Sequence, residues 1–222
     1  MNRHAMWAEA LGSFLVFACV IGSGVMGERL SGGNVAVALL GNTLATGAML
    51  FVLITMLGAI SGAHFNPAVT MVMRLRGDIA TSVALGHVVA QLAGGILGVW
   101  TAHLMFDLPV LEISTKARTG LGQWMGEGVA TFGLLLTIIG TMRMRPDWVP
   151  ASVALYITAA YWFTSSTSFA NPAITIARSL SNTFAGIAPA DVPGFIAAQI
   201  AGALLAHVAG KALFDGHAER AA

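Results

Sequence analysis

The chain has 222 residues, of which 56% are hydrophobic and only 9% are charged. A soluble domain carries roughly 25% charged residues, so this chain has too few to cover a water-exposed surface. Its formal net charge of +1 excludes the basic field that nucleic-acid binding requires, and its single cysteine, Cys19, excludes an internal disulfide. The composition therefore predicts a protein that is embedded in a lipid bilayer.

Six apolar stretches, each of about 20 residues, are long enough to span a bilayer. They lie near residues 5–26, 35–60, 80–105, 122–142, 149–167 and 192–214. The first follows Arg3 and looks in part like a signal peptide. Glu9 interrupts its apolar run, however, and a later segment matches it, so we expect an uncleaved span. The pattern predicts an all-α membrane protein with six transmembrane helices.

The lysines and arginines of the connections indicate the orientation, because cytoplasmic loops are enriched in both. With the N-terminus inside, the cytoplasmic set is Arg3, Arg74, Arg76, Arg143, Arg145, Lys211 and Arg220, and the outer set is Arg29, Lys116, Arg118 and Arg178. The larger cytoplasmic set favours both termini in the cytoplasm. An even number of spans agrees with that orientation.

Three polar landmarks recur in the same order along the two halves of the chain. The pairs are Glu9 with Glu127, Asn66 with Asn171, and Gln91 with Gln199. Three spans per repeat is an odd number, so the second repeat must lie inverted relative to the first. We therefore expect one transmembrane domain over residues 1–222, built from inverted repeats at about 5–105 and 122–214.

An Asn-Pro-Ala triplet occurs once in each half, within "HFNPAVT" and "FANPAIT". The triplets are Asn66, Pro67 and Ala68, and Asn171, Pro172 and Ala173. Each begins a stretch that is too short to span, at about 66–76 and 171–183. Proline suits the first helical position, and asparagine before it is a good N-cap. We expect two re-entrant half-helices that enter from opposite sides, since irregular backbone at that depth must line a wet cavity or be covered by protein.

Two such N-termini meeting in the membrane would present amide donors and positive dipole ends to a passing solute. Water and alcohol-like hydroxyl groups accept hydrogen bonds from those donors, whereas a cation or a hopping proton is repelled. Two triplets at equivalent places in inverted halves therefore predict a channel for small uncharged solutes.

Several buried polar residues allow more than one interpretation. Intramembrane carboxylates often mark function, and a proton relay is one reading of Glu9 and Glu127. Because each repeat has one such glutamate, a structural role is favoured, in which each carboxylate accepts hydrogen bonds from the backbone of a re-entrant loop. We expect Gln91 and Gln199 to support the loops in the same way. We expect His64 to hydrogen-bond within its loop or to face the cytoplasmic vestibule. The histidines show no HxxxH-type spacing, so we expect no metal site and no cofactor.

The paired "SGAHFNPAVT" and "TSFANPAIT", the repeated Glu and Gln, and the six-span layout closely resemble the aquaporin/glycerol-facilitator (major intrinsic protein) family. The resemblance covers nearly the whole chain. It implies a right-handed bundle of six helices and two half-helices, with one pore in each chain. It also implies a homotetramer in the bilayer.

The family's outer constriction usually combines an arginine directly after the second triplet with an aromatic residue from the second span. Here the residue after the triplet is isoleucine, and ungapped alignment to the two triplets gives the other three positions. The ring that the resemblance implies is Thr46, Ala159, Ser168 and Ile174. This ring lacks the large aromatic, the imidazole and the charge that keep a water-only pore narrow.

Arg178 lies one helical turn after Ile174. We expect its charge either at the outer mouth of the pore, or at the lipid interface and on loop carbonyls. The aspartate of the usual glycerol-conducting pattern is replaced by Thr175.

The sequence is similar to bacterial members of the family that lack the filter arginine and look like conduits for undissociated arsenous acid. That resemblance implies a passive channel of the bacterial inner membrane, with metalloid hydroxides as the leading solutes and water and glycerol as further ones. Three alternatives remain: a water-selective aquaporin, an ion-coupled secondary transporter built from inverted repeats, and an intramembrane hydrolase. The hydrolase is disfavoured because the serine of "GSG" (22–24) has no histidine placed by a recognisable pattern, so we expect no enzyme.

Overall fold

The structure is a computed structural model, and it describes residues 3–214. Arg220 and the outermost residues of the predicted 1–222 domain lie outside this range. The helices of the described range are α1 (Arg3–Leu30), α2 (Val35–Ser61), α3 (Pro67–Arg76), α4 (Thr81–Met105), α5 (Leu121–Met144), α6 (Val149–Phe163), α7 (Pro172–Arg178) and α8 (Val192–Phe214). Short 3₁₀ turns at Pro146–Trp148 and Pro189–Asp191 precede α6 and α8.

Five of these helices, α1, α2, α4, α5 and α8, are long and apolar enough to cross a membrane. The remaining predicted span, 149–167, is the helix α6, which has 15 residues and ends at Phe163 rather than near residue 167. It ends there because Thr164 has extended backbone, with φ −103° and ψ 139°. The chain then turns towards the second half-helix, and the six predicted spans are all present as helices.

The two half-helices α3 and α7 follow Asn66 and Asn171. α3 has ten residues and closes at Gly77, whose φ of 87° favours glycine. α7 has only seven residues, so its predicted extension to residue 183 is wrong. The chain tightens there: the N–H of Leu180 donates to the carbonyl of Ala177, and the carbonyl of Arg178 accepts from a later loop.

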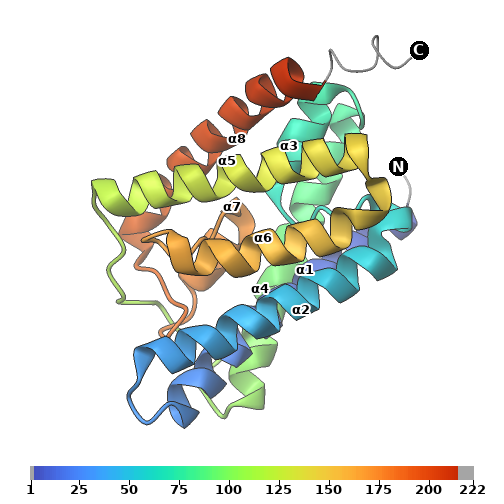
Figure 1. The fold of residues 1–222 in the computed structure, drawn as a ribbon. Coiled ribbons are helices and arrows are strands. Elements are labelled where there is room, and N and C mark those ends of the chain that lie inside the picture. The colour runs from blue at the N-terminus through green and yellow to red at the C-terminus, as the bar shows by residue number, and fades with distance from the viewer. Residues whose placement is uncertain (1–2, 215–222) are drawn as a thin grey trace, which may run out of the picture.

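The helices pack in an arrangement that repeats between the two halves. α1 packs on α4 as α5 packs on α8, and α2 packs on α6 across the middle. Each half-helix contacts the last helix of both halves, because α3 and α7 both pack on α4 and α8. In Figure 1, α5 and α8 lie on one side of the bundle, opposite α1 and α2. The two halves therefore repeat the same packing, as expected of an inverted repeat.

Glycines allow the closest helix pairs to approach. Gly94 and Gly98 of α4 lie against the backbone carbonyls of α1, and Gly202 of α8 lies against the carbonyl of Gly128 in α5. A Cβ atom at any of these three positions would overlap the facing carbonyl oxygen. Small residues at a helix interface permit such close backbone contact in membranes. The two crossings hold the half-helices between them.

Candidate functional site

Both asparagines cap their half-helices. Asn66 has φ −157° and ψ 119°, and Asn171 has φ −157° and ψ 112°, so each stands in extended backbone just before its proline. The Oδ1 atom of Asn66 accepts from the N–H of Ala68 at 2.9 Å, and that of Asn171 accepts from Ala173 at 2.9 Å. The caps fix the two amide planes, so their Nδ2 atoms point beyond the helix ends.

Those Nδ2 atoms bond across the middle of the protein. Asn66 Nδ2 donates to the carbonyl of Ala170 at 2.8 Å, and Asn171 Nδ2 donates to the carbonyl of Phe65 at 2.8 Å. The half-helices thus meet end to end through a reciprocal pair of bonds. Because an amide NH₂ carries two hydrogens, each asparagine retains one donor for a solute.

The two re-entrant loops share one unusual backbone pattern. In each, the residues three before and one before the asparagine have positive φ: 49° at Ala63 and 48° at Phe65, then 50° at Ser168 and 48° at Ala170. Non-glycine residues rarely adopt this region, and they persist in it only where the surroundings hold them. Buried acceptors behind each loop supply that support.

Behind the first loop stands Glu9, which is fully buried. Its carboxylate accepts from the backbone N–H groups of His64 at 2.9 Å and Phe65 at 2.8 Å, and from the Ser61 hydroxyl at 2.7 Å. Gln91 Nε2 donates to it at 2.7 Å. The carboxylate therefore satisfies loop N–H groups that have no helical partner in the bilayer.

Glu127 does the same behind the second loop. It accepts from the N–H groups of Phe169 at 2.8 Å and Ala170 at 2.9 Å, and from Gln199 Nε2 at 2.6 Å. Gln199 also donates to the Thr175 hydroxyl at 2.9 Å. Both oxygens of each carboxylate are thus occupied by the loops, an arrangement that suits support rather than proton relay.

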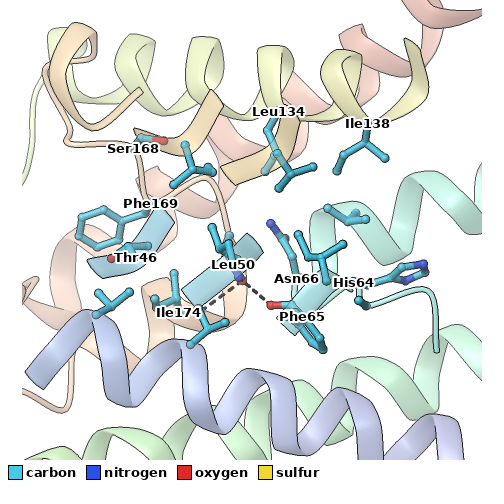
Figure 2. Close-up of a pocket in the computed structure, with 18 of the residues that line it drawn as sticks. Thr46, Leu50, His64, Phe65, Asn66, Leu134, Ile138, Ser168, Phe169 and Ile174 are labelled. Carbon is cyan, nitrogen blue, oxygen red and sulfur yellow. Dashed lines mark hydrogen bonds between the residues drawn. The ribbon is translucent and has the colours of Figure 1, made fainter. Parts of the chain in front are cut away.

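A cavity of about 150 Å³ passes the ends of the two half-helices. Its wall is mostly apolar, and its polar members are Thr46, His64, Asn66, Tyr161, Ser168, Asn171 and Arg178. Figure 2 shows His64 at one end, Thr46 with Ser168 at the other, and Asn66 between them. Among the described residues, no aspartate or glutamate lines this cavity.

Three of the four predicted ring residues, Thr46, Ser168 and Ile174, line the cavity. The fourth, Ala159, does not: it is exposed on the far face of α6, so its predicted position is wrong. The physical reason is that counting back from the second triplet crosses a turn, where helical periodicity does not hold.

Tyr161 lines the cavity on α6, where Ala159 was expected. Its hydroxyl donates to Thr46 Oγ1 at 3.4 Å and so links α6 to α2. Sequence reasoning missed it, although a signal was present: Val153, Ile157 and Tyr161 repeat every four residues on one helix face, and all three line the cavity.

Two polar side chains mark the ends of the cavity. The Ser168 hydroxyl is buried and has no partner within residues 3–214, so it is free to bond a solute. His64 Nδ1 lies 3.1 Å from Thr70 Oγ1, and its ring packs edge-on against His87 with centroids 5.3 Å apart. His64 thus joins the first loop to α3 through Thr70, and it also lines the cavity.

Arg178 is only 2% exposed and lines the cavity near Ile174. Its guanidinium carbon stands 3.3 Å from the centre of the Phe169 ring, and its Nε donates to the carbonyl of Ala185. The side chain therefore binds a loop carbonyl beside the cavity and does not extend to the lipid surface.

Comparisons with known proteins agree with this geometry. A family described as major intrinsic protein matches residues 1–165. Aquaglyceroporin AqpS of Rhizobium meliloti (strain 1021) is 56% identical over 199 residues, which cover 90% of this chain and 85% of that protein. Probable aquaporin PIP2-8 of Oryza sativa subsp. japonica is 32% identical over 175 residues, covering 72% of this chain and 62% of that one.

The same fold occurs in a solved structure, that of the aquaglyceroporin from Plasmodium falciparum. The two chains superpose with a TM-score of 0.68 over 95% of each, at 20% sequence identity. The paired triplets, the inverted bundle and these relatives together show that the chain is a multi-pass membrane protein of the major intrinsic protein family, to which the aquaporins and glycerol facilitators belong.

Proposed function

We propose that the chain is a passive channel for small uncharged solutes. The observation that carries the proposal is the pair of bonds from Asn66 and Asn171 to carbonyls of the opposite loop. They leave one amide hydrogen of each asparagine beside a cavity that no carboxylate of residues 3–214 lines. A neutral hydroxyl can accept from these donors in turn. A cation finds donors but no acceptor of opposite charge, so it stays in water.

The residues of the outer ring favour the passage of solutes larger than water. Ile174 stands where most of the family has arginine, and Thr46 and Ser168 supply hydroxyl groups beside it. A small neutral trihydroxide such as arsenous acid can accept from the asparagine amides and donate to the free Ser168 hydroxyl. We propose metalloid hydroxides as the leading solutes, with water and glycerol also passing. The name aquaglyceroporin, given to AqpS, agrees with solutes of this size.

The alternatives fit the cavity less well. An ion-coupled transporter needs a carboxylate next to the solute, whereas both oxygens of Glu9 and of Glu127 are bonded to the loops. A water-selective pore needs a narrower, charged ring than one with isoleucine at position 174.

We further propose a homotetramer in a bacterial inner membrane, with both termini in the cytoplasm. The first turn of α1 and the last turn of α8 lie at the same end of the bundle (Figure 1). The lysine and arginine distribution favours the cytoplasm for that end. Extensive apolar side chains on the outer faces of the helices suit lipid and neighbouring copies.

Stopped-flow light scattering of proteoliposomes tests the solute class. Wild type, Ile174→Arg and the matched apolar control Ile174→Val are compared in gradients of water, glycerol and arsenous acid. We expect the arginine variant to lose flux of glycerol and arsenous acid while it keeps water flux, and Ile174→Val to behave as wild type. Equal glycerol and arsenous acid flux in Ile174→Arg and wild type would show that residue 174 does not set the aperture.

A further inference from the structure

Arg178 is a buried cation without a carboxylate partner. It is 2% exposed, and it forms no ion pair within residues 3–214. An ionised side chain inside a membrane protein is expensive unless it is paired or faces a polar cavity. The side chain lines the cavity together with Ile174 and Tyr161, so the cavity is where its charge acts.

The position of the guanidinium is fixed from two sides. Its central carbon lies over the Phe169 ring, and Nε donates to the carbonyl of Ala185. The Phe169 ring is in turn held edge-on by Phe195, with centroids 5.0 Å apart. Among the described residues, no acceptor takes a hydrogen bond from the terminal nitrogens Nη1 and Nη2 of Arg178.

Arg118 provides a contrast within the same region. Its guanidinium also stands over Phe169, at 5.0 Å, but it does not line the cavity. All three of its nitrogens bond loop carbonyls: Nε to Gly186 at 2.8 Å, Nη1 to Ser166 at 3.3 Å and Nη2 to Phe184 at 3.5 Å. Arg118 therefore links the loops through all three of its nitrogens. Arg178 bonds a loop through Nε alone, and it lines the cavity.

We propose that Arg178 is a specificity-determining residue whose charge adds to the exclusion of protons and other cations at the half-helix ends. It takes over the charge that is missing at Ile174, four residues earlier, about 6 Å along the helix axis. A fixed charge in low-dielectric surroundings repels a cation strongly. Placing that charge one turn away leaves the ring at Ile174 open, so a wide aperture and cation exclusion coexist. The inference rests on the proposed function as a neutral-solute channel.

The test measures proton leak and glycerol flux in the same proteoliposomes, with a pH-sensitive dye inside and a potassium–valinomycin potential. Arg178→Gln keeps amide donors but removes the charge. We expect proton leak through this variant to rise more than about tenfold, because the barrier charge is lost. Glycerol flux, measured in the same vesicles, reports whether the variant pore is still open. Adding Ile174→Arg to Arg178→Gln is expected to return the leak towards the wild-type level.

Two more variants keep the test decisive. Phe169→Leu removes the ring that holds the guanidinium and is expected to raise the leak without removing the charge, even if Arg178→Gln does not fold. Arg118→Gln is the matched control: it weakens the loops, and we expect a lower melting temperature with an unchanged leak. A wild-type leak in both Arg178→Gln and Phe169→Leu, with glycerol flux intact, overturns the inference. Absence of glycerol flux in wild type overturns the proposed function instead.

Discussion

Asn66 and Asn171 are predictable as helix caps from sequence, because an asparagine before a proline in an apolar chain has few other roles. Tyr161 is not predictable by counting from the triplet. Residues 164–170 leave the helix before Asn171, and an error of two positions turns a helical side chain by about 200°, to the opposite face. That rotation puts Ala159 outside and Tyr161 inside. That the Ser168 hydroxyl is unpaired could not be predicted from sequence either, because it depends on which groups surround the side chain in the folded structure.

Tyr161→Ala should raise glycerol permeability relative to water permeability, because it removes an aromatic ring that lines the cavity beside Thr46. The matched control Tyr161→Phe keeps the ring and loses only the hydroxyl, so it should retain the wild-type ratio. Osmotic swelling of proteoliposomes in water and glycerol gradients gives both permeabilities. An unchanged ratio in Tyr161→Ala would place the narrowest point elsewhere.

Glu127→Gln should destabilise the protein on the order of 2–4 kcal/mol, because hydrogen bonds to a charged acceptor each contribute about 1.5–3 kcal/mol. The amide has one oxygen and cannot replace a carboxylate that accepts from Phe169, Ala170 and Gln199. Thermal unfolding in detergent, followed by circular dichroism, measures the loss. A wild-type melting temperature would mean that the second loop does not depend on this carboxylate.

The long helices were largely predictable at the scale of elements, because apolar length alone indicates them. The ends of α6 and α7 were not, since tertiary hydrogen bonds decide them. Thr164 leaves the helix to begin the second loop, and the turn after Arg178 is tightened by bonds to Ile176 and Ala177. The helix propensities of the residues do not depend on those hydrogen-bond partners, so they cannot predict where the two helices end. The close crossings of α1 with α4 and of α5 with α8, in contrast, follow directly from their glycines.

Gly94→Val should prevent correct packing of α4 on α1, because its side chain would overlap the carbonyl of Ala10. Overpacking of this kind typically costs about 1–3 kcal/mol, and facing backbone cannot move aside as a side chain does. Gly58→Ala in α2 is the control, since nothing lies within 4 Å of the added Cβ atom. Size-exclusion profiles and melting temperatures of both variants report the difference. Equal behaviour of the two variants would mean that α1 and α4 do not approach as closely as the structure shows.

At the scale of the whole molecule, recurrence of Glu, Asn and Gln in both halves was enough to predict an inverted repeat. What the repeat could not provide is the wall of the passage, because helices of different lengths line it from both halves. Apolar residues such as Leu50, Leu134 and Ile138 form most of that wall (Figure 2). A few donors on such a wall suit rapid passage of neutral solutes, which need to bind weakly and leave.

The central claim is that the protein passes small uncharged solutes passively and excludes ions. Its most direct test follows solute uptake and membrane current in one preparation of the purified protein. Glycerol and arsenous acid uptake into proteoliposomes is recorded with and without proton and sodium gradients, and ionic current is recorded in planar bilayers. We predict uptake that depends only on the solute gradient and no steady ionic current. Uptake driven by a proton or sodium gradient, or a sustained current carried by the protein, would contradict the account.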